Sequence, residues 1–247
     1  MTQSRGRARI GVLVPFTNSN LEPDMALMRP VGVSLHFARM GGYDADEIPD
    51  ADQMHGLGAA DLDAPLALLM GVKPDVILYG CTSATLTHGP AFDHALAQRI
   101  RSASGVATVT AAGALAHALN TLGVSRIGFA SPYVPAINDL AIGFLAQGGV
   151  QTIARSEVSE TLGNDGQGAL TPEAVFELGL AADHPEAQAL VLSCTDMRSA
   201  EVLERLEKAV GKPVICSNQA MVFAALRTLG IAEPMSGYGQ LLQRGRL

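Results

Sequence analysis

Two cysteines stand at matching places in this chain, and their thiols are the groups best suited to covalent or acid–base chemistry. Cys81 follows the apolar run VILYG at residues 76–80, Cys194 follows LVLS at residues 190–193, and a threonine comes after each. Short apolar runs without alternating polar residues are typical of parallel strands that are buried on both faces. Ligands bind at the carboxyl ends of such strands. We therefore expect both thiols at a ligand-binding edge.

The residues that follow each cysteine favour thiolate chemistry. Thr82 and Ser83 in the first motif, and Thr195 in the second, can start a helix; a helix N-terminus lowers the pKa of a nearby thiol. Two thiols that face one cleft can act as acid and base, or as nucleophile and acid. A single cysteine is more often a buried core residue, but the matched placement favours a catalytic role. We predict Cys81 and Cys194 as the catalytic pair.

Of three further side chains, one is a core candidate and two allow two interpretations each. Cys216 lies in the apolar run VIC, and its counterpart in the first half is Thr110, so we predict a core residue. Asn18 follows the first predicted strand, and Tyr133 follows the corresponding strand of the second half. Each can donate a hydrogen bond to a carboxylate, but asparagine also shapes turns and tyrosine also covers the core. Residue type and position leave both interpretations open.

The composition excludes several classes of protein. Of the 247 residues, 48% are hydrophobic and 17% are charged, so a substantial core can form. The net charge of −7 argues against a nucleic-acid partner, and no apolar run approaches the ~20 residues of a membrane span. Three cysteines without CxxC spacing predict neither disulfides nor a metal site, and no phosphate-binding loop follows a strand. We expect a soluble cytoplasmic protein.

The elements that must position these residues occur twice. RIGVLVP at residues 9–15 is nearly repeated as RIGFASP at 126–132, and the two cysteine motifs follow at similar distances. Residues 105–123 also align with residues 211–230, with one insertion. Three echoes in the same order indicate an internal duplication of a small α/β unit.

Strands that alternate with helical patterns predict two doubly wound parallel-sheet domains, α/β in class and pseudo-symmetric, with the site at their interface. We place the first domain at residues 1–104 plus about 211–247, and the second at 105–210. Residues 37–54 and 157–168 are less regular. The predicted helices have apolar residues at helical spacing and cover residues 57–70, 90–100, 134–147, 172–182 and 199–210.

At these residues the chain resembles the aspartate/glutamate racemase superfamily, and within it the branch of maleate cis–trans isomerases and arylmalonate decarboxylases. The resemblance spans nearly the whole chain. It rests on VPFTN at 14–18, YGCTS at 79–83, SPY at 131–133, LSCT at 192–195 and GYG at 237–239. The order and spacing of the two cysteine motifs are its most specific part. Gly80 stands where the isomerases usually have alanine, and the residues after Cys194 also differ from theirs.

The resemblance implies catalysis at the domain interface without a cofactor. Cys81 matches the nucleophile of the isomerases, and Cys194 matches the opposing cysteine. Asn18, Tyr133 and Asn164 match the groups that hold the substrate carboxylates. The residues after each cysteine, Thr82, Ser83 and Thr195, are expected to bind substrate with them.

We therefore expect a homodimeric isomerase of a small carboxylate, most like a maleate-to-fumarate isomerase. A racemase of amino or hydroxy acids is an alternative, because two thiols can also transfer a proton between the faces of a carbon acid. Arylmalonate decarboxylases keep only the second cysteine, so Cys81 argues against that activity. A binding protein with two lobes and structural thiols is the alternative outside enzymes.

Overall fold

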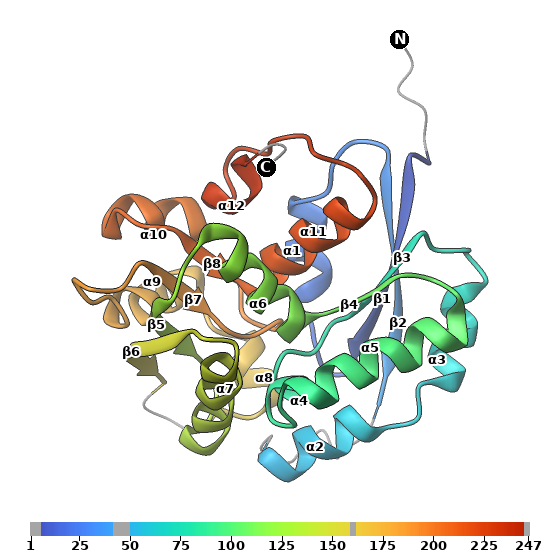
Figure 1. Cartoon of the computed structure of the whole chain (residues 1–247), viewed down its shortest axis with the longest axis horizontal. Helices are drawn as coiled ribbons and strands as arrows, with labels where there is room; N and C mark the ends of the chain where they lie inside the picture. Colours follow the sequence, from blue (N-terminus) through green and yellow to red (C-terminus); the bar gives the residue numbers. More distant parts are fainter. Residues whose placement is uncertain (1–5, 42–49, 159–161, 245–247) are drawn as a thin grey trace.

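The computed structural model describes residues 6–41, 50–158 and 162–244, which form two four-stranded parallel sheets (Figure 1). The first sheet has the order β2-β1-β3-β4, with β1 (Ala8–Pro15), β2 (Val33–Met40), β3 (Val76–Tyr79) and β4 (Thr108–Thr110). The second has the order β6-β5-β7-β8, with β5 (Arg126–Ser131), β6 (Gln151–Glu157), β7 (Ala189–Leu192) and β8 (Val214–Cys216).

The two sheets are copies of one arrangement, which confirms the duplication and the fold class. β1 pairs with β3 in a register that places Ile10 beside Val76, and β5 pairs with β7 in a register that places Ile127 beside Ala189. Every residue of β3 and β7 is buried. Parallel strands with both faces covered carry unbroken apolar runs for this reason.

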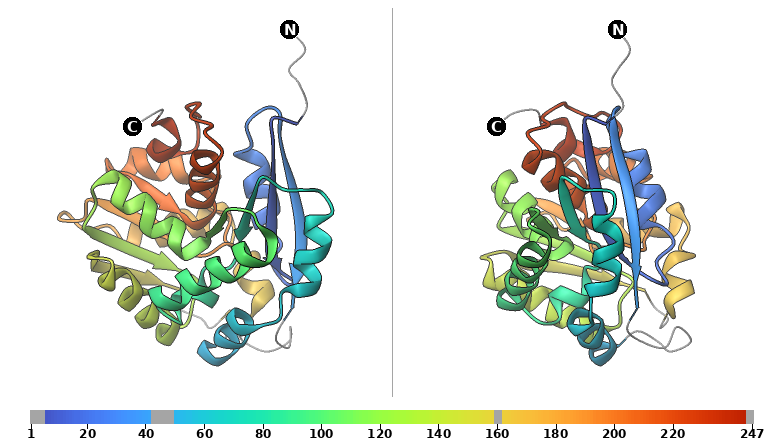
Figure 2. Two further views of the ribbon diagram at one scale, coloured as in Figure 1. Left: turned by 45° about the vertical axis from the view of Figure 1, so that its right-hand side comes forward. Right: turned by 90° about the vertical axis from the view of Figure 1, so that its right-hand side faces the viewer.

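Helices cover both sheets, and two of them lie between the halves. Around the first sheet lie α1 (Leu21–Leu27), α2 (Ala51–Ala59), α3 (Asp63–Met70), α4 (Ser83–Leu86) and α5 (Pro90–Ser104). Around the second lie α7 (Pro135–Gln147), α8 (Asn164–Gly168), α9 (Pro172–Ala181), α10 (Leu203–Val210) and α12 (Gly239–Gln243). The helices α6 (Ala111–Leu122) and α11 (Ser217–Thr228) pack on each other between the two sheets (Figures 1 and 2).

The helices α6 and α11 begin in the same way, at the two positions that the duplication pairs. The Thr110 hydroxyl accepts a hydrogen bond from the backbone N–H of Gly113 over 3.0 Å. Cys216 takes the place of Thr110 in the second half, and its sulfur accepts from the N–H of Gln219 over 3.3 Å. Cys216 is fully buried. Its predicted place in the core is therefore confirmed, and its sulfur also caps a helix.

Three predictions of local structure are wrong. The single helix predicted over residues 57–70 is two helices, α2 and α3, which are separated around Ala60. The stretch 37–54 is not irregular where it is described, because β2 runs to Met40 and α2 starts at Ala51. The helix predicted from residue 199 starts at Leu203.

The strands also divide between the sheets differently from the predicted domain ranges. β4 lies in the range predicted for the second domain, yet it pairs with β3 in the first sheet. β8 lies in the range predicted for the first domain, yet it pairs with β7 in the second sheet. α11 nevertheless packs against α1 and β3 of the first half. α11 also packs against β8 and α12 of the second half, and the domain limits stay a prediction.

None of the helices in the described parts of the chain has the length and apolar character needed to cross a bilayer.

Candidate active site

A small pocket lies where the carboxyl ends of the strands of both halves meet, and both motif cysteines line it. Its cavity volume is about 40 Å³, roughly the room of three water molecules. The residues that line it come from both halves: Pro15, Thr17, Asn18, Met54, Cys81, Ser83, Tyr133, Ile137, Gln167, Cys194, Thr195 and Asp196.

Cys81 reaches the pocket from the turn that joins β3 to α4. Its sulfur lies 3.7 Å from the hydroxyl of Ser83 and is within hydrogen-bonding reach of the backbone N–H groups of Ser83 and Ala84. The Ser83 hydroxyl itself donates to the sulfur of Met54 over 2.9 Å. Met54 belongs to α2, so this helix covers the Cys81 side of the pocket.

α2 is held on α4 by a pair of stacked histidines. The rings of His55 and His88 stack with centroids 4.2 Å apart, and His88 stacks in turn on Phe92 at 3.8 Å. A ring nitrogen of His55 lies 3.0 Å from the carbonyl oxygen of Thr87, and a ring nitrogen of His88 lies 3.0 Å from the carbonyl oxygen of His55. The histidines therefore fix the helix that carries Met54.

Cys194 reaches the pocket from the other half, just after β7. The backbone N–H of Asp196 donates to its sulfur over 3.3 Å. The thiol itself donates to the side-chain oxygen of Gln167 in α8, with 3.8 Å between sulfur and oxygen. Both cysteines are almost fully buried, with 5% of Cys81 and 3% of Cys194 exposed. Any reagent that reaches these sulfurs must therefore enter through the pocket.

The Tyr133 hydroxyl connects the two cysteine environments. It hydrogen-bonds with Cys194 and with Ser83, and the charges that the two cysteines can carry help to raise its pKa. The Tyr133 backbone N–H donates to the hydroxyl of Ser131 over 3.2 Å, and the side-chain amide of Asn138 donates to the Tyr133 carbonyl over 3.2 Å. These contacts fix the loop between β5 and α7, so the hydroxyl is held between the thiols.

The expectation that the thiols have lowered pKa values is wrong. Burial raises the pKa of Cys81, although N–H groups of Ala84 and Ser83 act in the opposite direction. Burial and the nearby Asp196 carboxylate raise the pKa of Cys194 to about 12. Because desolvation penalises the charged form, both sulfurs are thiols at neutral pH, and Cys194 holds its proton tightly.

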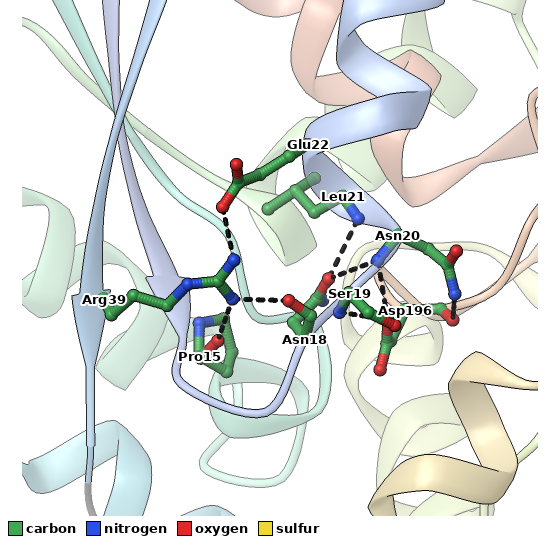
Figure 3. Close-up of polar contacts among 8 residues, drawn as sticks. All are labelled: Pro15, Asn18, Ser19, Asn20, Leu21, Glu22, Arg39 and Asp196. Atoms are coloured by element: carbon green, nitrogen blue, oxygen red, sulfur yellow. Dashed lines mark hydrogen bonds and ion pairs between the residues drawn. The ribbon is translucent and has the colours of Figure 1, made fainter.

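Asn18 connects the two halves beside the pocket. Its side-chain N–H donates to the Thr195 hydroxyl over 3.0 Å, and that hydroxyl donates to the carbonyl of Gly80 over 3.0 Å. Its side-chain oxygen accepts from the backbone N–H of Leu21 over 2.9 Å, as Figure 3 shows. Asn18 therefore shapes a turn and also lines the pocket. Its contact with a substrate carboxylate stays a prediction.

Gly80 is required by close packing at the end of β3. A Cβ atom on it would lie 2.5 Å from the Leu21 side chain and 3.0 Å from the carbonyl oxygen of Leu13. In this chain Leu21 fills the space that an alanine methyl group would occupy.

Six of the eight predicted site residues line this one pocket: Asn18, Cys81, Ser83, Tyr133, Cys194 and Thr195. Thr82 does not line it, because its hydroxyl donates to the Ser217 hydroxyl over 2.9 Å at the buried start of α11. Asn164 begins α8, but its side chain lies outside the described part of the structure. Within the described residues, no cluster of three or more His, Cys, Asp or Glu side chains is placed to hold a metal ion.

The sequence analysis missed four polar or sulfur-containing residues that line the pocket, namely Thr17, Asp196, Gln167 and Met54. Asp196 directly follows the second motif, so the residue after Cys194-Thr195 carried a usable signal. Its carboxylate accepts from the backbone N–H groups of Ser19 and Asn20 over 2.8 and 2.9 Å (Figure 3). Met54 and Gln167 come from α2 and α8, within or beside stretches predicted to be irregular.

Comparison with known proteins places this geometry in a family context. The profile of the arylmalonate decarboxylase family matches residues 10–242. A maleate isomerase of Nocardia farcinica is 30% identical over 251 residues, which cover 97% of each chain. An arylmalonate decarboxylase of Bordetella bronchiseptica is 27% identical and covers 93% of this chain and 91% of its own.

Solved structures agree with the fold. The structure of the maleate cis–trans isomerase of Nocardia farcinica bound to TRIS matches with a TM-score of 0.87 and 26% identity, over 96% of this chain and 98% of that one. A cysteine-to-serine variant of the Nocardia farcinica enzyme, with the same TM-score and 24% identity, contains a covalently bound succinylcysteine intermediate. It covers the same shares of the two chains.

Proposed function

The chain belongs to the arylmalonate decarboxylase family, and we propose that within this family it is a maleate cis–trans isomerase that forms a covalent adduct on Cys81. One observation carries the proposal. Cys81 and Cys194 enter the same buried pocket from opposite halves of the duplicated fold. The Tyr133 hydroxyl hydrogen-bonds with Cys194 and with Ser83, the neighbour of Cys81. The succinylcysteine of the Nocardia farcinica variant supports the same chemistry.

The reaction needs a nucleophile on one side and an acid on the other. The Cys81 thiolate attacks one olefinic carbon of maleate, and a carbon–sulfur bond forms. The electron pair of the double bond moves to the neighbouring carbon, which takes the proton of Cys194. Rotation about the new single bond follows. The Cys194 thiolate then removes a proton from that carbon, and the double bond re-forms. The carbon–sulfur bond breaks, its electron pair returns to the Cys81 sulfur, and fumarate leaves.

The contrast between the two thiols suits these roles. Cys194 lies beside the Asp196 carboxylate, and burial together with this charge raises its pKa to about 12, so it begins as a proton donor. Burial also raises the pKa of Cys81, but neighbouring N–H groups and the Ser83 hydroxyl oppose that effect. The Cys81 thiolate is therefore a minor form at neutral pH and must be generated before addition.

Neutral donors are proposed to hold the two substrate carboxylates. The side chains of Asn18, Ser83, Thr195 and Tyr133 line the pocket, and the family pattern adds Asn164. Negative charge develops next to one carboxylate during addition, and fixed hydrogen-bond donors stabilise such charge without reorganising. Thr82 is proposed to act through its backbone, since its hydroxyl is bonded to Ser217.

Trapping of the adduct tests this function. In the Cys194→Ala variant, water must protonate the carbanion and no thiolate can remove that proton again. Incubation with maleate is therefore expected to leave one succinyl unit trapped at Cys81, located by peptide mass mapping. Cys81→Ser is the matched control and should gain no mass. Proton NMR of the wild-type protein in D2O should follow maleate turning into fumarate. Exchange at an amino-acid α-carbon without an adduct would instead indicate a racemase.

Decarboxylation is the second candidate, because the family profile and the Bordetella bronchiseptica relative carry that activity in their names. It uses one proton donor and no sulfur–carbon bond. An arylmalonate can be added in the same NMR experiment. If its signal disappears with the wild-type protein and equally with the Cys81→Ser variant, the protein is a decarboxylase.

We also propose that the enzyme is a homodimer in the cytoplasm. The reaction needs two free thiols, and a reducing compartment keeps thiols free. Light scattering during gel filtration measures the oligomeric state, and a mass of one chain would contradict the dimer.

A further inference from the structure

Asp196 places a carboxyl group at the pocket, and the surrounding chain fixes its position. Only 8% of the residue is exposed. One carboxyl oxygen, Oδ1, accepts from the N–H groups of Ser19 and Asn20 over 2.8 and 2.9 Å (Figure 3). The side chain of Asn20 in turn donates to the carbonyl oxygens of Asp196 and Gly168 over 2.9 and 2.8 Å. A proton on this carboxyl group therefore belongs on the other oxygen, Oδ2.

The charges at the pocket are all of one sign when a dicarboxylate binds. Among the described residues that line it, no side chain is a lysine, arginine or histidine, and Asp196 is the acidic one. A substrate with two carboxylates, an ionised Asp196 and a Cys81 thiolate would together place four negative charges there. A single pair of like charges a few ångströms apart near a protein surface weakens binding by roughly 10³-fold.

Other ionisable groups near Asp196 do not relieve this repulsion. Burial raises the pKa of each pocket thiol and of Tyr133, so these three groups are neutral at pH 7. Arg39 bonds the carbonyl of Asn18 and the carboxylate of Glu22, beyond the Ser19–Asn20 turn (Figure 3). The remaining charged residues on the described elements around Asp196 are Asp24 on α1, Asp165 on α8, and Arg198, which pairs with Glu201.

We propose that Asp196 takes up a proton when the dicarboxylate substrate binds, and that the resulting carboxylic acid donates a hydrogen bond from Oδ2 to a substrate carboxylate. This inference rests on the proposed function, because it assumes a substrate with two negative charges. Burial already raises the pKa of Asp196 to about 6. Two further negative charges raise it more, so the acid form dominates in the complex.

Proton uptake can be measured directly. The Cys81→Ser protein does not turn over and has no thiol at residue 81 that could release a proton. Fumarate is the probe, because both of its carboxylates stay ionised at pH 7. Titration calorimetry at pH 7 in two buffers of different ionisation enthalpy is expected to give an uptake of about one proton per fumarate. The dissociation constant should rise about tenfold per pH unit between pH 7 and 8.

The matched variant is Asp196→Asn in the same Cys81→Ser background, since asparagine keeps an oxygen for the N–H groups of Ser19 and Asn20. It should bind fumarate without proton uptake, and at least tenfold tighter than its parent at pH 8. No uptake by the Cys81→Ser protein, or undiminished uptake in the double variant, would overturn the inference. The measurement on the Cys81→Ser protein keeps Asp196 in place, so it tests the inference even if the Asp196→Asn variant does not fold.

Wild-type turnover separates the two proposals. Conversion of maleate without proton uptake on fumarate binding would leave the isomerase standing and remove the role of Asp196. Proton uptake without conversion would do the reverse. Failure of fumarate to bind, together with no conversion of maleate by the wild type, would overturn both.

Discussion

The side-chain amide of Asn18 donates to the Thr195 hydroxyl over 3.0 Å, and this contact joins the first half of the chain to the second beside the two cysteines. The same hydroxyl donates back to the carbonyl of Gly80, one residue before Cys81. A residue after one catalytic-motif cysteine thus fixes the backbone before the other. The duplicated motifs position each other.

Replacement of Thr195 by valine should destabilise this junction. Valine has nearly the shape of threonine but no hydroxyl, so the Asn18 amide and the Gly80 carbonyl each lose a buried partner. Leaving buried polar groups unpaired costs about 1–3 kcal/mol. Urea unfolding of Thr195→Val should show that loss in the free energy of unfolding. Thr195→Ser keeps the hydroxyl and should lose less; equal losses in both variants would show that the hydrogen bonds do not matter.

The three cysteines should separate into two that are needed for turnover and one that is not. Cys81→Ser is expected to abolish maleate conversion, because an alcohol is a far weaker acid and nucleophile than a thiol. Cys194→Ala should lower kcat by about 10²–10⁴-fold, the usual contribution of a general acid. Cys216→Ser keeps a capping atom for α11 and should affect stability only. Proton NMR measures all three, and full activity in Cys194→Ala would refute the paired mechanism.

The sequence predicts best the parts of the fold that are buried on both faces. β1, β3, β5 and β7 are central strands with unbroken apolar runs, so the duplication and the two thiols could be found from residue types alone. The sequence analysis did not predict β2 and β6, which are edge strands. Their residues are mostly half-exposed, so SLHFAR in β2 mixes polar and apolar residues without a clear period.

The parts of the site that could not be predicted depend on contacts between distant residues. Asp196 matters because Ser19 and Asn20, in the other half, donate to it. The raised pKa values of the thiols could not be read from helix-start residues, because burial outweighs the N–H groups of the turn. Thr82 fits a helix start in sequence, yet α11 supplies Ser217 as its partner.

Alkylation should report the order of thiol reactivity. Only the thiolate reacts with iodoacetamide, and raised pKa values make it rare at neutral pH. Labelling of Cys81 should therefore be slow at pH 7, rise about tenfold per pH unit up to pH 9, and slow again with saturating fumarate in the pocket. Cys194, with its pKa raised to about 12, should react later. Peptide mass mapping over time measures the order, and early labelling of the fully buried Cys216 would contradict it.

Asp24 should make the protein less stable as the pH rises through the mildly acidic range. The residue is 2% exposed on α1, and its carboxylate accepts from the Asn218 side chain over 2.9 Å and from the N–H of Ala200 over 3.2 Å. Burial raises its pKa to about 6, above the value of about 4 in an unfolded chain. Stability from this group is therefore fully present below pH 4 and is lost as the pH rises through 6.

The Asp24→Asn variant has no such titration, so the comparison isolates this one group. The free energy of unfolding of the wild type, minus that of Asp24→Asn, should fall by about 2–3 kcal/mol between pH 4 and pH 7. Asp196 titrates in the same range, but it is present in both proteins and cancels in the difference. Urea unfolding at both pH values measures it, with Asp52→Asn as a control that makes the same change on the exposed face of α2. A difference that stays level from pH 4 to pH 7 would show that the hydrogen bonds of Asn218 and Ala200 hold Asp24 ionised despite its burial.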